Sequence, residues 1–203
     1  MKYIKTFLLL IGILATFLMG YSQYKYNLIT KMVMAPALHE KALDIYMNMA
    51  VRLFETGDIT MASIRRVKVN KDVSIGDIEE AMHNAAIDLN IKEVGTLPLS
   101  QEVENQTGKK QKFLKIYQYC VPTTAITMVA YSDAFSAYLP CRIALVEAKD
   151  GTKWLYTLDM DLMIYGGAPL PKKLNKLALQ VQKTIYAIQN AGANGDYDPD
   201  SEE

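Results

Sequence analysis

Residues 119–161 read YCVPTTAITMVAYSDAFSAYLPCRIALVEAKDGTKWLYTLDMD, and this stretch determines the fold that the sequence predicts. Pro122 precedes a run of small and apolar residues, and proline is favoured in the first turn of a helix. A strand begins at Cys141, and the turn residues 149–151 (KDG) separate it from a second apolar run. Such a turn between two apolar runs is typical of paired antiparallel strands. The stretch therefore predicts a short helix followed by a β-hairpin.

Further helices and strands lie on both sides of this stretch. Apolar residues at helical spacing predict amphipathic helices over 74–90 and 170–190. Gly192 is expected to end the second helix. β-branched residues with partial alternation predict strands, at 59–69, 92–99 and 111–120. The predicted fold class is α+β: a single compact domain of βαβ-βα-ββ type with flanking amphipathic helices and an N-terminal transmembrane helix.

The N-terminus has the pattern of an export signal or membrane anchor. Lys2 and Lys5 precede the apolar run FLLLIGILATFLMG, residues 7–20, and basic residues stay on the cytoplasmic side. Tyrosines follow the run, as in the aromatic belt at a membrane surface. We expect an uncleaved single-pass anchor that contacts the membrane through residues 4–21 and leaves the C-terminal domain extracytoplasmic, in the periplasm. The alternative is a protein secreted after cleavage behind Ser22.

The pattern divides the chain into four parts. They are a signal anchor (1–26), a juxtamembrane connector with an amphipathic helix (27–57), the α+β domain (58–192) and an acidic tail (193–203). The tail carries no predicted core residue and is expected to be disordered.

The helix predicted within the second part, over residues 36–55, has one apolar face. Because such a face needs a partner surface, it is expected to pack on the protein's own domain or on another chain. The residues on it are Leu38, Ala42, Ile45, Met49 and Leu53.

The composition of the chain argues against several classes of function. Lys and Arg number 22, as do Asp and Glu, so the chain lacks the basic excess of a nonspecific nucleic-acid binder. Two cysteines do not make a disulfide scaffold, and two histidines do not make a histidine metal cage. The sequence contains no full catalytic constellation and no cofactor motif, so an enzyme is not favoured. We expect an accessory or binding module that works as a homodimer or as a subunit of a membrane complex.

Cys120 and Cys141 are the chemically most distinctive pair. The intervening residues predict one helix and a turn, a path that brings the two strand ends together. In an exported protein the pair is permitted to form a disulfide, and closing a loop of this size stabilises a fold by about 3 kcal/mol. The alternatives are two buried free thiols, or a site for redox chemistry, sulfur transfer or ligand binding. A helix N-terminus beside Cys120 would lower its pKa and favour the reactive site.

Arg142, Asp159 and Asp161 form a possible polar site beside the cysteines. In a continuous strand the two aspartates share one face, where paired carboxylates are able to serve acid–base chemistry or bind a cation. The structural alternatives are a solvated strand end or an ion pair from Arg142 across the hairpin. Aromatic residues near this region either line a small-molecule pocket or pack the sheet. They are Trp154, Tyr117, Tyr119, Tyr131, Tyr138 and Tyr156.

A methionine-rich juxtamembrane segment offers soft ligands. Thioethers bind Cu(I), although methionine is more often a packing residue at helix interfaces. The candidate ligands are Met32, Met34, His39, Met47 and Met49.

Residues 119–161 resemble the signature region of the domain-of-unknown-function 302 family. The match lies in the Cys120 and Pro122 corner, in the Leu-Pro-Cys-Arg run at 139–142, and in the Asp-Gly turn at 150–151. Val121 separates the cysteine from the proline, which departs slightly from the family pattern. The resemblance spans residues 58–165 and implies a compact α+β domain that tends to dimerise. It implies no reaction.

Three hypotheses for function follow. The first is a membrane-anchored extracytoplasmic binding or accessory module. The second is a thiol-based protein for redox or sulfur-compound handling that uses Cys120 and Cys141. The third is copper handling through the methionine-rich segment.

Overall fold

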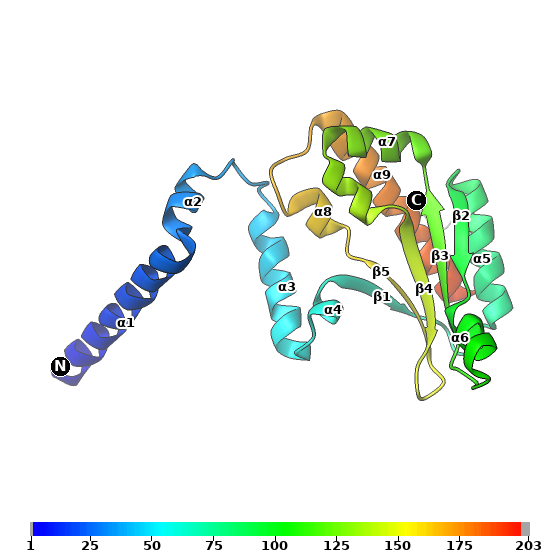
Figure 1. Cartoon of the computed structure of the whole chain (residues 1–203), viewed down its shortest axis with the longest axis horizontal. Helices are drawn as coiled ribbons and strands as arrows, with labels where there is room; N and C mark the ends of the chain where they lie inside the picture. The colour runs from blue at the N-terminus through cyan, green and yellow to red at the C-terminus, as the bar shows by residue number, and fades with distance from the viewer. Residues whose placement is uncertain (1, 200–203) are drawn as a thin grey trace. The chain divides into compact units, whose positions relative to one another are not determined.

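A five-stranded antiparallel sheet forms the centre of the domain in this computed structural model, which describes residues 2–199. The strand order is β1-β5-β4-β3-β2, so β1 and β2 lie at opposite edges (Figure 1). The strands are β1 (Ile64–Lys68), β2 (Lys92–Leu97), β3 (Leu114–Cys120), β4 (Cys141–Glu147) and β5 (Lys153–Leu158). The helices and this sheet confirm the α+β class predicted from the sequence.

Two helices, α5 (Ile75–Asp88) and α9 (Lys172–Asn194), pack against each other and cover one face of the sheet (Figure 1). Helix α5 begins with a capping box in which the Ser74 side chain accepts from the Asp77 amide and the Asp77 carboxylate accepts from the Ser74 amide. Each large apolar side chain that leaves water stabilises the fold by roughly 1.5–3 kcal/mol, so burial at this interface contributes strongly to stability. Its fully buried side chains include Ile78, Ile143, Leu145, Leu155 and Ile185.

Helix α9 continues through Gly192, so the prediction that this glycine ends the helix is wrong. The helix ends at Asn194, and Gly195 follows it with a φ of 75°, a left-handed conformation that favours glycine. A Cβ atom at position 192 would lie 2.6 Å from Cγ of Met82. Gly192 therefore lies inside the helix because α5 and α9 approach closely there.

The juxtamembrane helix α3 (Ala42–Thr56) begins later than the predicted start at residue 36, and Leu38 precedes it as an exposed residue. Ile45, Met49 and Leu53 are half-buried, and the Tyr46 hydroxyl donates a 2.6 Å hydrogen bond to the Gly166 carbonyl. The apolar face of α3 therefore packs against the protein's own domain.

A short helix, α4 (Ile59–Ala62), occupies the start of the segment predicted as a strand over 59–69. The Asp58 carboxylate accepts a 2.8 Å hydrogen bond from the Thr60 amide, which caps this helical turn. The strand therefore begins only at Ile64. The remaining short helices of the domain are α6 (Leu99–Thr107), α7 (Pro122–Tyr131), the 3-10 helix η1 (Asp133–Tyr138) and α8 (Asp161–Tyr165).

The beginning of the predicted acidic tail is ordered against the domain. Ala193 is buried in α9, and Tyr197 packs on the core and donates a 2.8 Å hydrogen bond to the Asp88 carboxylate. The expectation of a tail without core residues is therefore wrong for this part. Residues 200–203 of the predicted tail lie outside the described residues.

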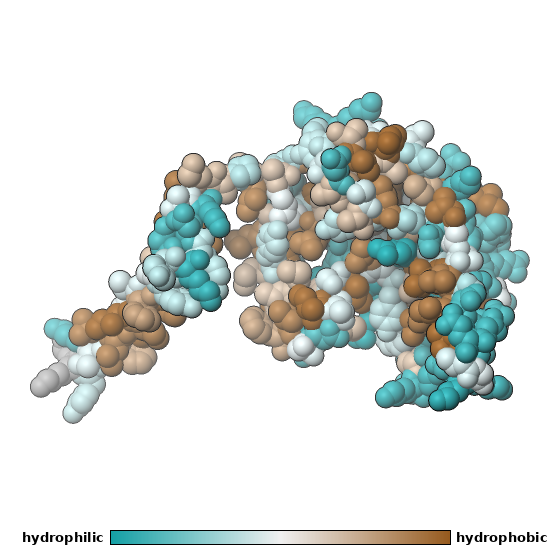
Figure 2. All heavy atoms as spheres, in the orientation of Figure 1, coloured by the Kyte–Doolittle hydropathy of each residue, from teal (hydrophilic) through white to brown (hydrophobic). Residues whose placement is uncertain are grey.

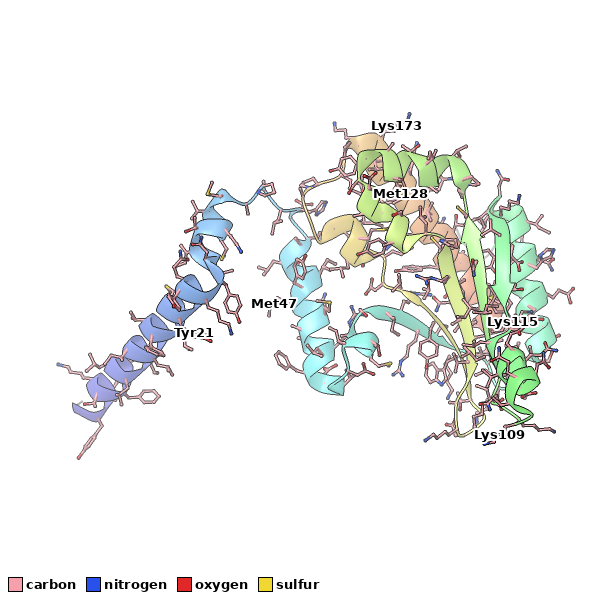
Figure 3. The ribbon with its side chains drawn as sticks, in the orientation of Figure 1. Tyr21, Met47, Lys109, Lys115, Met128 and Lys173 are labelled. Atoms are coloured by element: carbon pink, nitrogen blue, oxygen red, sulfur yellow. The ribbon has the colours of Figure 1, made fainter. Side chains whose placement is uncertain are left out.

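The residues before His39 form a compact unit of their own. It contains α1 (Lys2–Tyr26) and α2 (Leu28–Met34). Residues Tyr3–Tyr26 are long and apolar enough to cross a membrane, and a signal sequence would pass the same test. Apolar side chains cover the N-terminal half of α1 (Figure 2). At its C-terminal end Lys25 lies over the rings of Tyr21 and Tyr26, at 5.7 and 5.2 Å from their centres. Figure 3 labels Tyr21 on this helix.

Candidate functional site

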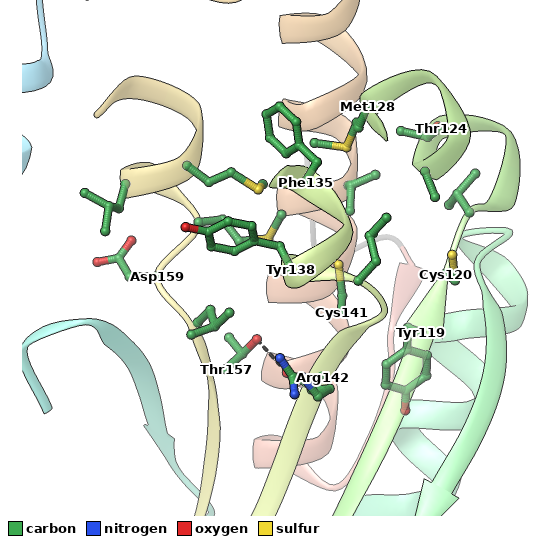
Figure 4. Close-up of a pocket in the computed structure, with 18 of the residues that line it drawn as sticks. Tyr119, Cys120, Thr124, Met128, Phe135, Tyr138, Cys141, Arg142, Thr157 and Asp159 are labelled. Carbon is green, nitrogen blue, oxygen red and sulfur yellow. Dashed lines mark hydrogen bonds between the residues drawn. The ribbon is translucent and has the colours of Figure 1, made fainter. Parts of the chain in front are cut away.

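A cavity of about 250 Å³ opens at the end of the sheet where β3 ends and β4 begins. Helix α7 and η1 lie on one side of it, and residues from the end of β5 through α8 lie on another (Figure 4). The apolar side chains that line it are Tyr119, Val121, Ala125, Met128, Phe135, Tyr138, Leu139, Leu158, Met160, Leu162, Met163 and Val181.

The local sequence explains how the chain forms this cavity. β3 ends at Cys120, and Pro122 starts α7 at its first position, where the ring's fixed φ suits a helix. The chain returns through η1 and a cis peptide bond between Leu139 and Pro140. Cys141 then pairs with Tyr119 in the sheet. The α7–η1 segment is therefore a loop of helices that leaves and re-enters the sheet at the same end.

Both cysteines line the cavity as free thiols. Because Tyr119 pairs with Cys141, strand alternation directs the Cys120 side chain to the opposite face of the sheet. The sequence correctly predicted that the strand ends meet. Both side chains nevertheless reach the cavity at this end of the sheet.

The surroundings of both thiols favour the protonated form. Burial raises the pKa of Cys141 to about 11, and the neighbouring Cys120 adds to this while Arg142 opposes it. Burial also raises the pKa of Cys120 above its ordinary value. Raised pKa values leave few thiolates at neutral pH, so the expected activation by the start of α7 does not dominate.

Three polar side chains lie along one side of the cavity, from Arg142, Thr157 and Asp159, while Met128, Phe135 and Thr124 lie on the opposite side (Figure 4). The Thr157 hydroxyl donates a 2.8 Å hydrogen bond to the Arg142 carbonyl. The guanidinium of Arg142 has no ion pair or side-chain hydrogen bond with any residue in the range 2–199.

The two aspartates do not share a strand, so that part of the prediction is wrong. β5 ends at Leu158, Asp159 follows in a loop, and Asp161 is the first residue of α8. Asp161 accepts a 2.7 Å hydrogen bond from Gln182 and lines a neighbouring hollow. Only Asp159 reaches the cavity wall.

Asp159 pairs with Arg52 rather than with Arg142. Nη2 of Arg52 lies 2.8 Å from Oδ2 of Asp159, and the two side chains are 38% and 19% exposed. The other Asp159 oxygen, Oδ1, accepts a 3.2 Å hydrogen bond from the Asp161 amide. An ion pair across the hairpin, proposed from the sequence, is therefore replaced by a pair between the cavity wall and α3.

Two of the six aromatic candidates line the cavity, Tyr119 and Tyr138. Tyr131 contacts the ring of Phe135, and Trp154 lies under Arg66. The sequence reading missed the methionines at 128, 160 and 163 and the partner Arg52. Helix α7 is apolar on most sides, so its sequence gave no signal for the side that faces a cavity.

The proposed copper ligands are not gathered by α3. Met47 is 55% exposed while Met49 is half-buried against the domain, so the two thioethers point to different sides of the helix. His39 packs against the ring of Tyr165, and its Nδ1 accepts from the Lys41 amide. Met32 and Met34 belong to the separate N-terminal unit and are exposed.

The family model for the domain of unknown function DUF302 matches residues 65–191. This chain belongs to that family. The match confirms the resemblance seen in the sequence and includes every cavity-lining residue except Ser63. Helices α1 to α4 precede the matched segment.

A solved DUF302 structure has the same fold. It is the crystal structure of an uncharacterized conserved DUF302 protein from Bacillus stearothermophilus, with 13% sequence identity and a TM-score of 0.51. The similarity covers 63% of this chain and 96% of that one. No curated protein matches the chain.

Proposed function

We propose that this DUF302 protein is a membrane-anchored extracytoplasmic binding module that holds a small, mainly apolar ligand in the cavity beneath α7 and η1. The observation that carries the proposal is the lining, which combines aromatic, aliphatic and methionine side chains with few polar groups. Binding sites for small molecules are typically concave, apolar and provided with a few placed polar groups. Methionine suits such a site because its flexible thioether adapts to the shape of a ligand.

The N-terminal helix supports the anchored location. Its length and composition suit a membrane span, and the lysines at 2 and 5 favour a cytoplasmic N-terminus. In this orientation the domain that contains the cavity lies on the extracytoplasmic side. Secretion after signal cleavage is the alternative, and N-terminal sequencing of the mature protein distinguishes the two.

An accessory role, as a homodimer or in a membrane complex, is part of the same proposal. Leu43, Met47, Val51 and Phe54 form a second apolar stripe on α3, and Phe54 is 86% exposed. Such a stripe favours association. Mass measurement of the full chain in mild detergent tests this, and a monomer without a co-purifying partner would contradict it.

Calorimetric titration with 1-octanol tests the cavity itself. The full-length protein is placed in phosphatidylcholine nanodiscs, and empty nanodiscs provide the background for octanol that enters lipid. We expect saturable binding above background for the wild type. Absence of that binding would refute the proposal.

Two substitutions on α7 locate the binding. Ala125 lines the cavity, whereas Ala130 is exposed on the same helix. We expect Ala125→Phe to abolish octanol binding by filling the space, and Ala130→Phe to leave it unchanged. Saturable binding that survives Ala125→Phe in a folded protein would place the octanol elsewhere.

Thiol-based redox or sulfur-compound handling is a second candidate. The observation in its favour is that Cys120 and Cys141 line one cavity as free thiols. Their raised pKa values oppose it, because the thiolate is the reactive form. Copper handling through the juxtamembrane methionines, the third candidate, has no supporting contact among residues 2–199.

A further inference from the structure

The charge on the cavity wall is unbalanced. Arg142 and Asp159 are the two residues with ionised side chains among those that line it. Asp159 is compensated by Arg52 at 2.8 Å, whereas Arg142 has no charged partner in the described range 2–199. With Arg52 counted, which does not itself line the cavity, the charges at the wall sum to one net positive charge.

The positive charge of Arg142 reaches the interior. It favours the thiolate of Cys141, although burial and the neighbouring Cys120 outweigh it there. An anion that entered the cavity beside Cys141 would experience the same positive potential. Arg142 is itself exposed, whereas the lining beyond it is mainly apolar, so water and salt screen part of this potential at the cavity mouth.

The charged part of the wall lies on a different side from the side chains of Met128 and Phe135, beside which the smaller polar residue Thr124 also lies. Arg142 and Thr157 lie on one side, and the side chains of Met128 and Phe135 lie across the space (Figure 4). A ligand that matches this arrangement has a charged end and an apolar body. A purely apolar ligand would leave the exposed guanidinium to water and make no use of its charge.

We propose that the ligand of this cavity is a small amphipathic carboxylate whose head binds Arg142 and whose hydrocarbon body lies toward Met128 and Phe135. This inference rests on the proposed binding function and names the class of its ligand. The planar guanidinium presents parallel donors that fit a carboxylate in a bidentate arrangement.

The volume sets the size of the apolar body. A dry apolar cavity of about 150 Å³ holds benzene, and this cavity measures about 250 Å³. By this comparison, the cavity has room for a saturated hydrocarbon body of roughly eight to ten carbon atoms. Octanoate and 1-octanol are therefore suitable probes, because they share a chain length and differ in the charge of the head.

Titration of both probes into the full-length protein in phosphatidylcholine nanodiscs at pH 7.5 tests the inference. We expect the wild type to bind octanoate about tenfold more tightly than 1-octanol, the range expected for one charge-assisted contact. Arg142→Gln should remove this preference, so that the variant binds octanoate and 1-octanol about equally. Arg66→Gln provides the matched control, because Arg66 carries the same charge on another strand but does not line the cavity.

The outcomes separate the two proposals. If 1-octanol binds and octanoate binds no more tightly, the cavity binds apolar ligands but the carboxylate class is wrong. If Arg142→Gln and Arg66→Gln weaken octanoate binding equally, the loss comes from the lower net charge of the protein. The specific role of Arg142 is then refuted. If neither probe binds the wild type, the proposed binding function itself fails.

Discussion

Arg52 of α3 and Asp159 of the cavity wall form an ion pair with a 2.8 Å separation, and they are 107 residues apart in sequence. Arg52 lies outside the segment matched by the family, whereas Asp159 lies within it. The pair therefore joins a helix that precedes the family domain to the site inside that domain. It also leaves Arg142 as the uncompensated charge of the cavity.

Arg52→Gln is expected to lower the free energy of unfolding by about 1–2 kcal/mol, because the variant leaves a half-buried carboxylate without its charged partner. Urea unfolding of the full chain in detergent measures the change. Arg66→Gln, which removes the same charge from an exposed site, should change stability less. A double variant with Asp159→Asn should recover part of the loss, and additive losses would show that the pair is not coupled.

The same substitution should weaken carboxylate binding. Without Arg52, the negative charge of Asp159 opposes an anion at Arg142, so we expect octanoate affinity to fall about threefold to tenfold. Affinity for 1-octanol should not change. Asp159→Asn in the Arg52→Gln background removes the negative charge and should restore octanoate binding. Failure of that restoration would argue against an electrostatic link between α3 and the cavity.

Cys141 should react slowly with alkylating reagents. With a pKa of about 11, roughly one side chain in a thousand is a thiolate at pH 8. We expect iodoacetamide to modify Cys141 about a hundred times more slowly than a free cysteine, with the rate rising as the pH approaches 11. Peptide mass spectrometry of the folded protein follows each cysteine separately. Fast modification at pH 7 would instead favour the thiol-based function.

Glu79 should make the stability of the fold depend on acid pH. Burial raises its pKa, but hydrogen bonds from Lys115 at 2.7 Å and Tyr117 at 2.6 Å, with the charge of Lys115, outweigh burial (Figure 3 labels Lys115). The net pKa lies below the ordinary value of 4.5. A lowered folded-state pKa stabilises the fold above pH 4.5, and this contribution disappears as the pH falls through the folded-state value.

Glu79→Gln tests this pH dependence. At pH 7 the variant should be less stable than the wild type by about 1 kcal/mol, and the difference should shrink as the pH falls below 4.5. Glu80→Gln is the matched control, because Glu80 is exposed on the same helix. Thermal unfolding at a series of pH values measures both variants. A difference that stays constant from pH 7 to pH 3 would show that Glu79 does not stabilise through its charge.

Local patterns predicted those parts of the fold that depend on neighbouring residues. The turn at 149–151 has its glycine at a φ of 81°, and the strand–helix–strand path brought Cys120 and Cys141 to one cavity. The pairing of Arg52 with Asp159 escaped prediction because nothing local links residues so far apart. The cavity methionines escaped because an apolar residue on a short helix has the same sequence signal whether it faces a core or a ligand.

Gly192 illustrates how a tertiary contact overrides a local preference, and Gly192→Ala provides the corresponding test. Alanine is favoured over glycine within a helix by about 1 kcal/mol, so local preference alone predicts stabilisation. The added Cβ would lie 2.6 Å from Cγ of Met82 and 3.1 Å from Cδ1 of Leu155, and overpacking of this kind costs about 1–3 kcal/mol. We therefore expect a net loss of about 1–2 kcal/mol in urea unfolding.

Gly76→Ala is the control for helix preference. Gly76 lies in the first turn of α5, and its nearest neighbour would be Oγ of Ser74 at an ordinary 3.6 Å. This variant should keep the helical gain and stabilise the fold by about 0.5–1 kcal/mol. A loss of stability in Gly192→Ala together with a gain in Gly76→Ala would identify the close approach of α5 and α9 as the reason for glycine at 192. Stabilisation by both would mean that Met82 moves aside at little cost.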